Sequence, residues 1–265
     1  MNSARIVALL EPFLDRPLAP AQLEQTSIYI DILLRWNTRI NLTAIRNPEE
    51  IVTRHFGESF FLARHVFPEA NRGTERDCSR FAVRGSGLVI DIGSGAGFPG
   101  LPVKIWSPGI RLTLVESNHK KVAFLREVAR ALTLTNVDIS AERAEALAHR
   151  LVIPSSPDCE TIAGASPNPP ASHREAVLAP ADVVTFRAVE NFNRTLPLAL
   201  RFLAPTGRLA ILITAAQFKA LSTELSLHSP HLRFPAAVPQ LQWQTIDVPQ
   251  SRERVLALGS HSIRA

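Results

Sequence analysis

The apolar positions of this chain change their period along its length, and the change predicts two kinds of structure. Residues 21–36 carry apolar side chains at three-to-four spacing, and Pro48-Glu49-Glu50 opens a second segment of this kind, so both are predicted helices joined by a turn over 37–47. From residue 88 onward, short apolar runs alternate with segments of helical period. The predicted strands are 88–92, 111–115, 137–140, 182–186 and 208–213, and the predicted helices are 101–106, 119–132 and 191–203.

This alternation predicts an α/β fold, because parallel strands need crossover helices between them. Residues 243–248 and 254–258 flank a breaker-rich segment and predict an antiparallel hairpin that closes the sheet. Residues 71–87 and 154–180 show no periodic pattern of apolar residues, so we predict that both are solvated loops without a chemical role. We expect 154–180 to be a flexible insertion. We expect a helical extension with a linker over 1–86 and an α/β domain over 87–265.

Composition limits the class of protein. A hydrophobic fraction of 46% excludes wholesale disorder, and no apolar run approaches the roughly 20 residues that cross a bilayer. The amino terminus, with Glu11 and Asp15 beside its leucines, is a poor signal peptide, so we expect a cytoplasmic protein without membrane association. We also expect a monomer. Cys78 and Cys159 have no C-x-x-C partner, so neither a disulfide framework nor a metal site is expected.

Charge favours a polyanionic partner. The formal net charge is +5, and only four of the 29 basic residues are lysines. The guanidinium of arginine forms bidentate hydrogen bonds with phosphate and stacks on bases, which favours a nucleic-acid partner. A G+C-rich genome would replace lysine with arginine everywhere, so the ratio alone leaves that second explanation open.

The most informative segment is Val89 to Gly100, where a predicted strand runs through Asp91 into glycines at 93, 95 and 97. Such a turn brings bare backbone to a ligand. The dinucleotide fingerprint needs its third glycine where Phe98 stands, so the spacing favours S-adenosylmethionine over a nicotinamide cofactor. The alternative is a glycine-rich turn without a ligand.

Polar residues follow the next predicted strands. Glu116 ends the second strand and can accept both ribose hydroxyls of a cofactor, or else cap a helix. Ala144 and Glu145 follow the third strand, where they suit either an adenine edge or a helix amino end. Arg187 follows the fourth strand and suits a substrate phosphate or the cofactor carboxylate, the alternative being an ion pair with Glu190.

One further motif is rejected. Asn168-Pro169-Pro170-Ala171 is similar to the N-P-P-aromatic box of amino-group methyltransferases, but it lacks the aromatic residue and follows no predicted strand.

Taken together, several short motifs resemble one family. They are W-N-x-x-x-N-L-T from Trp36, R-H-x-x-x-S from Arg54, I-D-I-G-S-G-A-G-F-P-G from Ile90, V-E-S-x-x-K-K-V-x-F-L from Val115, and Arg187-Ala188. The combination closely resembles the bacterial small-subunit ribosomal RNA guanine-N7 methyltransferases, once called glucose-inhibited division protein B. The likeness runs from about Leu33 to Leu258 and skips the two long loops.

The resemblance implies a Rossmann-like class I methyltransferase with a seven-stranded, mostly parallel sheet, an antiparallel C-terminal strand and an N-terminal helical extension. It implies S-adenosylmethionine as methyl donor and guanine N7 in the decoding-site loop of 16S ribosomal RNA, free or in the small subunit, as acceptor. Together with the glycine loop, it gives the expected cofactor contacts Asp91, Gly93, Gly95, Gly97, Phe98, Glu116, Ala144, Glu145 and Arg187. The candidates for positioning the substrate are Asn41, Arg54, His55 and Arg187.

The chain also departs from that family. Thr214-Ala215-Ala216 stands where lysine-glycine is common, and Glu58 replaces a common aspartate. No acid–base residue is assigned, since guanine N7 carries an in-plane lone pair and needs no general base. Two rival hypotheses remain, namely a non-catalytic ribosome-binding module that retains the fold and a nicotinamide-dependent oxidoreductase.

Overall fold

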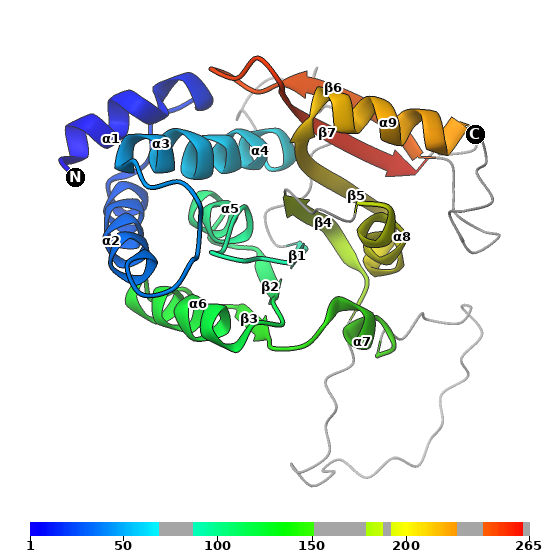
Figure 1. Ribbon diagram of the computed structural model, residues 1–265, viewed down its shortest axis with the longest axis horizontal. Helices are drawn as coiled ribbons and strands as arrows, with labels where there is room; N and C mark the ends of the chain where they lie inside the picture. The colour runs from blue at the N-terminus through cyan, green and yellow to red at the C-terminus, as the bar shows by residue number, and fades with distance from the viewer. Residues whose placement is uncertain (69–86, 151–178, 188–191, 227–240, 262–265) are drawn as a thin grey trace, which may run out of the picture.

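A computed structural model describes residues 1–68, 87–150, 179–187, 192–226 and 241–261, in which helices surround one twisted sheet (Figure 1). The helical segments are α1 (Ser3–Leu10), η1 (Glu11–Phe13), α2 (Pro20–Asn37), α3 (Pro48–Ile51), η2 (Val52–Gly57), α4 (Glu58–Val66), α5 (Gly100–Trp106), α6 (His119–Ala131), α7 (Ala144–Ala148), α8 (Phe192–Phe202) and α9 (Ala215–Ser226). The strands are β1 (Leu88–Ile92), β2 (Arg111–Val115), β3 (Val137–Ser140), β4 (Ala181–Arg187), β5 (Leu203–Thr214), β6 (Leu241–Asp247) and β7 (Arg254–His261).

The sheet has seven strands in the order β3-β2-β1-β4-β5-β7-β6. Strands β1 to β5 pair in parallel, whereas β7 runs antiparallel to both β5 and β6. This confirms the predicted fold class and the closing hairpin. The strand order reverses between β1 and β4, which is the point where α/β sheets bind ligands at their carboxyl ends.

Alternation along the strands explains why the sheet carries helices on both faces. In β1, Val89 belongs to one buried apolar cluster, while Leu88, Ile90 and Ile92 belong to the other. Strand β5 divides its side chains in the same way, with Leu212 in the first cluster. A strand buried on both faces reads as a continuous apolar run, as these segments do in the sequence.

The helical extension shares the first cluster with the sheet. Ile6, Tyr29 and Phe56 from the extension pack in the same buried group as Leu101 of α5 and Phe124 of α6. Helix α4 packs on α5, and α2 packs on both α5 and α6, so these helices cover one face of the sheet. The extension therefore forms part of the hydrophobic core.

Three features differ from the predicted elements. The helix predicted from Pro48 contains one π-helical segment, η2, between α3 and α4. Helices α1 and α9 were not predicted. Most of the predicted loops 71–87 and 154–180 lies outside the described residues, as do Cys78, Cys159 and the Asn168–Ala171 motif.

Candidate functional site

The glycine loop leaves the carboxyl end of β1 in a conformation that suits glycine. Gly93, Gly95 and Gly97 have φ angles of +67°, +58° and +86°, which side-chain-bearing residues rarely adopt. The amide groups of Gly93 and Ser94 donate to the carbonyl of Val115 at 2.9 and 3.1 Å, which fastens the loop to the end of β2.

These glycines meet different surroundings. A Cβ atom added to Gly93 would have no heavy atom within 4 Å, so this position faces open space. A Cβ added to Gly97 would overlap the Tyr29 hydroxyl and lie 2.5 Å from Cδ1 of Leu101. Gly93 therefore leaves room for a ligand, whereas the lack of a side chain at Gly97 lets Tyr29 of α2 and Leu101 of α5 pack against the loop.

Asp91 lies beneath this loop with no solvent exposure. Its Oδ2 accepts a hydrogen bond from the Gly100 amide at 3.2 Å, and its Oδ1 has no hydrogen-bond partner among the described residues. Burial raises the pKa of its carboxyl to about 7, and the negative charge of Glu116 adds to this rise. The unpartnered oxygen can accept a hydrogen bond from a ligand donor.

Glu116 joins the loop to the end of β2. Its Oε2 accepts from the Gly95 amide at 2.9 Å, and its Oε1 accepts from the Asn118 amide at 2.8 Å. A carboxylate offers about four lone-pair sites, so each oxygen retains capacity for another donor. The cap of α6 comes instead from the Asn118 side chain, which accepts from Lys120 and Lys121. The structure therefore does not use Glu116 as a side-chain cap of that helix.

Ala144 and Glu145 lie at the same edge of the sheet, in the first turn of α7 after β3. Glu145 is exposed, and it makes no hydrogen bond or ion pair with the part of the chain that the structure describes. The neighbouring Glu142 pairs with Arg150 at 3.1 Å. Glu145 is thus available to a ligand, and its adenine contact remains a prediction.

Phe98 is buried in an aromatic cluster that joins the loop to the helical extension. Its ring stacks on His55 at 4.7 Å and on Tyr29 at 5.3 Å between centroids, and Phe56 meets it edge-on at 5.0 Å. The Tyr29 hydroxyl also donates to the carbonyl of Ala96. Phe98 is only 7% exposed as a whole residue, and its ring is packed among these aromatic side chains. The predicted cofactor contact would therefore have to come mainly through its backbone.

Arg187 ends β4 and is held by the helical extension. Its Nη1 donates to His55 Nδ1 at 2.9 Å, and its Nη2 lies 3.2 Å from Oε2 of Glu58. The alternative partner Glu190 lies outside the described residues. Burial lowers the pKa of Arg187 to about 10, so its guanidinium remains charged at neutral pH.

His55 has a defined protonation state. A guanidinium can only donate, so Nδ1 accepts and must be unprotonated. The proton is then on Nε2, which donates to Thr43 Oγ1 at 2.7 Å. Burial, together with the charges of nearby arginines, lowers the pKa of His55 to about 2. His55 therefore positions Arg187 and is unsuited to act as a general base near neutral pH.

Thr43 belongs to the turn between α2 and α3, which a buried asparagine shapes. The side-chain oxygen of Asn37 accepts from the amides of Leu42 and Thr43 at 3.0 and 3.1 Å. Asn41 is exposed, and its Oδ1 accepts from Arg46 at 2.9 Å. The contact of Asn41 with a substrate remains a prediction.

Glu58 organises a cluster of arginines that the sequence did not reveal. Its side chain is 1% exposed. Arg54 donates to its Oε1 at 3.1 Å, while Arg187 and Arg254 lie 3.2 and 3.0 Å from its Oε2. The i,i+4 spacing of Arg54 and Glu58 was the only local signal, because the other two arginines come from distant strands.

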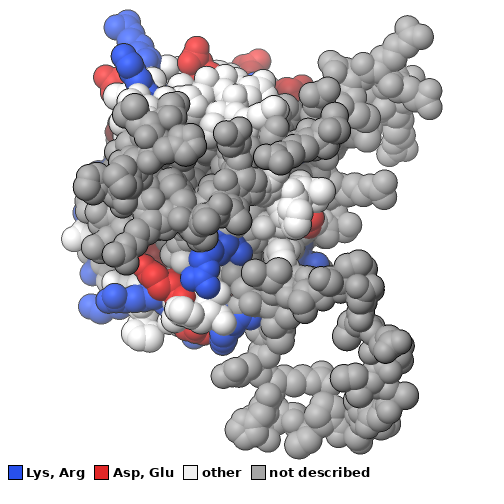
Figure 2. All heavy atoms as spheres, turned by 90° about the vertical axis from the view of Figure 1, so that its right-hand side faces the viewer, with Lys and Arg blue, Asp and Glu red and all other residues white. Residues whose placement is uncertain are grey.

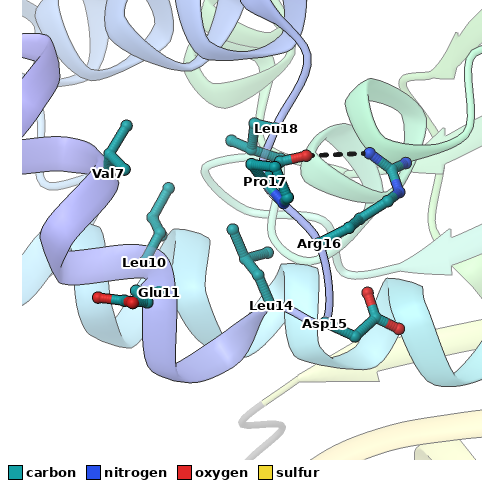
Figure 3. A pocket seen from close by; sticks show the side chains of 8 residues that line it. All are labelled: Val7, Leu10, Glu11, Leu14, Asp15, Arg16, Pro17 and Leu18. Carbon is teal, nitrogen blue, oxygen red and sulfur yellow. Dashed lines mark hydrogen bonds between the residues drawn. The ribbon is translucent and has the colours of Figure 1, made fainter.

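The hollow drawn in Figure 3 lies away from the glycine loop. The hollow in Figure 3, about 320 Å³ in volume, is lined by residues between Val7 and Leu18 and by no residue of the glycine loop or sheet edge. The described residues contain no group of metal-ligating side chains and no helix that is long and apolar enough to span a membrane.

The parallel sheet, its switch point and the glycine loop define a Rossmann-like methyltransferase fold. The chain belongs to the rRNA small subunit methyltransferase G family, whose model, GidB, matches residues 22–162. The family supports S-adenosylmethionine as the cofactor that the glycine loop predicted, and it argues against the nicotinamide-dependent rival.

Individual relatives agree with this assignment. A ribosomal RNA small subunit methyltransferase G of Xylella fastidiosa (strain M23) is 44% identical over 124 residues, which is 47% of this chain and 50% of the relative. The protein of the same name from Bacillus subtilis (strain 168) is 37% identical over 145 residues, or 54% of each chain. The chain thus aligns with about half the length of these curated relatives.

Among solved structures, a ribosomal protein L11 methylase from Lactobacillus delbrueckii subsp. bulgaricus has a TM-score of 0.47 and 13% identity, covering 78% of this chain and 80% of that one. Similarity at this level has no bearing on the function.

Proposed function

We propose that this protein transfers the methyl group of S-adenosylmethionine to N7 of a guanine in the decoding-site loop of 16S ribosomal RNA. The observation that carries the proposal is the family match over residues 22–162, which include the glycine loop, Glu116 and Glu145. The geometry adds Arg187 to the same edge of the sheet.

The residues present fit the proposed cofactor. Open space at Gly93 admits a ligand against the backbone, and the free acceptor sites of Glu116 suit the two hydroxyls of a ribose. Asp91 would face the positively charged methionine end, Glu145 the adenine amine and Arg187 a carboxylate or phosphate. When bound, S-adenosylmethionine supplies an electrophilic methyl group on a sulfonium.

The protein residues then need to align the acceptor rather than to move a proton. Guanine N7 is a hydrogen-bond acceptor with an available lone pair. Holding two reactants in line can contribute about 7–11 kcal/mol to lowering the barrier. The neutral, doubly hydrogen-bonded His55 agrees with a site that has no general base.

The substrate edge must be accessible for this reaction. N7 faces the deep major groove of an RNA helix, which side chains cannot read, so the guanine has to be in an open loop or splayed out. We assign Asn41 and Arg54, which are exposed or half-exposed on the extension, to contacts with that loop.

Methyl transfer to defined RNA tests the proposal. Purified protein is incubated with labelled S-adenosylmethionine and either naked 16S ribosomal RNA or small subunits lacking the modification, and the product is digested and mapped by mass spectrometry. We expect label at N7 of one guanine in the decoding-site loop. Binding to RNA without any label would favour a non-catalytic module, and label at another atom would refute the assigned acceptor.

A further inference from the structure

The cluster around Glu58 carries more positive than negative charge. Three guanidinium groups, from Arg54, Arg187 and Arg254, surround one buried carboxylate. The exposed Glu50 lies 3.8 Å from Arg54 at the outer side, and the neighbouring His55 is neutral. Buried charges are normally paired, so an excess of cations at one site favours the binding of an anion.

The arginines also retain unused donors. Nη2 of Arg254 is buried and has no hydrogen-bond partner among the described residues. Its Nε lies 3.0 Å from Oε2 of Glu58, so that side of the guanidinium is ion-paired. A buried charged donor without a hydrogen bond is unfavourable, and an acceptor of suitable shape would satisfy Nη2.

The cluster lies at the edge of the sheet where the proposed reaction takes place. Arg254 begins β7 and pairs in register with Thr214 at the carboxyl end of β5. Arg187 ends β4, the neighbour of β1 and its glycine loop. Arg54 reaches the cluster from η2 with 43% of its side chain exposed, so the cluster is open to solvent on that side.

Other basic residues do not form a comparable group in view. Figure 2 shows lysine and arginine side chains at separate places on the described surface of one face, with acidic side chains between them. The described basic side chains of this face are therefore interspersed with acidic ones, unlike the three arginines gathered on one carboxylate.

We propose that Arg54 and Arg254, held in place by Glu58, bind a backbone phosphate of the substrate nucleic acid next to the target base. This inference rests on the proposed function for the identity of the nucleic acid. The planar guanidinium of arginine can form two parallel hydrogen bonds with a pair of phosphate oxygens. Two guanidiniums held by one carboxylate can therefore donate to a phosphate from two sides. Arg187, which contacts His55 and Glu58, supports the pair from β4.

The test compares Arg254→Gln and Arg54→Gln with Arg111→Gln in the full chain. Arg111 is exposed at the amino end of β2, on the opposite edge of the sheet, so the control removes the same charge elsewhere. The probe is a short RNA hairpin with a guanine-containing loop, and its affinity is measured by fluorescence anisotropy over a range of salt concentrations. S-adenosylmethionine affinity is measured on the same samples by calorimetry.

Loss of one phosphate contact makes the plot of log K against log salt shallower by about 0.7, which corresponds to about eightfold weaker binding at 50 mM salt and about threefold at 200 mM. We expect this change for Arg254→Gln and Arg54→Gln and a smaller one for Arg111→Gln. Cofactor affinity should stay within about twofold of the wild type.

Two results would overturn the inference. Weaker cofactor binding with unchanged RNA binding in Arg254→Gln would assign the cluster to the cofactor carboxylate. RNA binding no weaker than in Arg111→Gln would make the cluster purely structural. If Arg254→Gln does not fold, Arg254→Lys is tested instead, because lysine keeps the charge and loses the planar guanidinium. RNA binding that is weaker than in the wild type with the same salt dependence would support the phosphate contact. RNA binding with wild-type affinity would contradict it.

Methyl transfer separates this inference from the proposed function. A wild-type protein that transfers no methyl group, while Arg254→Gln still weakens RNA binding, would refute the function and leave the phosphate contact standing. Methyl transfer by the wild type with unaltered RNA binding in Arg254→Gln would do the reverse.

Discussion

Two glycines of one loop provide a matched pair of substitutions, because both have positive φ but only one faces empty space. Gly93→Ala and Gly97→Ala each place an alanine in the left-handed region, at a cost of about 1–2 kcal/mol. Gly93→Ala adds no clash, so its effect on folding stability should end there. Gly97→Ala also overpacks the contact with Tyr29 and Leu101, which costs about 1–3 kcal/mol more.

The two variants should therefore separate folding from binding. In thermal unfolding, where 1 kcal/mol shifts the midpoint by about 2–4 °C at this chain length, Gly97→Ala should melt several degrees below Gly93→Ala. In calorimetry, Gly93→Ala should weaken S-adenosylmethionine by about 5- to 150-fold, since its methyl group occupies the proposed binding space. Wild-type affinity in Gly93→Ala, or equal melting of the two variants, would refute this reasoning.

The further predictions concern three polar residues. Burial raises the pKa of Asp91 to about 7, so its carboxyl is protonated below that pH in the free protein. A cationic ligand favours the carboxylate, and calorimetric affinity for S-adenosylmethionine should rise by up to about tenfold per pH unit below pH 7 and then level off. Asp91→Asn should flatten this profile, and a flat wild-type profile would contradict the assignment. His55→Leu removes the acceptor for Arg187 and should lower kcat/KM by about 10- to 100-fold, with partial recovery in His55→Gln. Because burial lowers the pKa of His55 to about 2, its imidazole resonances in NMR should not shift between pH 5 and 8, and a titration near 6.5 would contradict the neutral state assigned to this histidine. Glu58→Gln leaves buried guanidiniums without their carboxylate and should destabilise the fold by about 3–5 kcal/mol, seen as a lower thermal midpoint, whereas an unchanged midpoint would show that the carboxylate is dispensable.

The sequence predicted the bounds of the first three strands, of which β1 and β2 are largely buried and β3 is only partly buried. Residues 88–92, 111–115 and 137–140 were predicted with the bounds that the structure gives to β1, β2 and β3, because short segments that contain apolar residues end at polar or glycine residues there. Helix α9 was missed although a local signal exists. Thr214 and Gln217 form reciprocal hydrogen bonds, which is the capping-box pattern of a serine or threonine followed three residues later by a glutamate or glutamine.

The arrangement of the site could be predicted only in part. The carboxyl ends of parallel strands meet at one edge, so the common location of the Gly93 loop, Glu116 and Arg187 followed from the alternation alone. The role of Glu58 did not follow, since Arg187 and Arg254 reach it from strands far away in the sequence. The contact of Tyr29 with the loop could not be predicted either, because nothing near Tyr29 in sequence indicates a hydrogen bond to Ala96.

The line of hydrogen bonds from Thr43 through His55 to Arg187 makes the turn after α2 and the end of β4 one mechanical unit. A ligand that orders the turn also fixes the imidazole and hence the guanidinium, and a ligand on the guanidinium acts on the turn. Thermodynamic linkage requires both effects to have the same size. If nucleic acid occupies one end and the cofactor the other, any change that one makes in the affinity of its counterpart must be matched by an equal factor in the reverse direction.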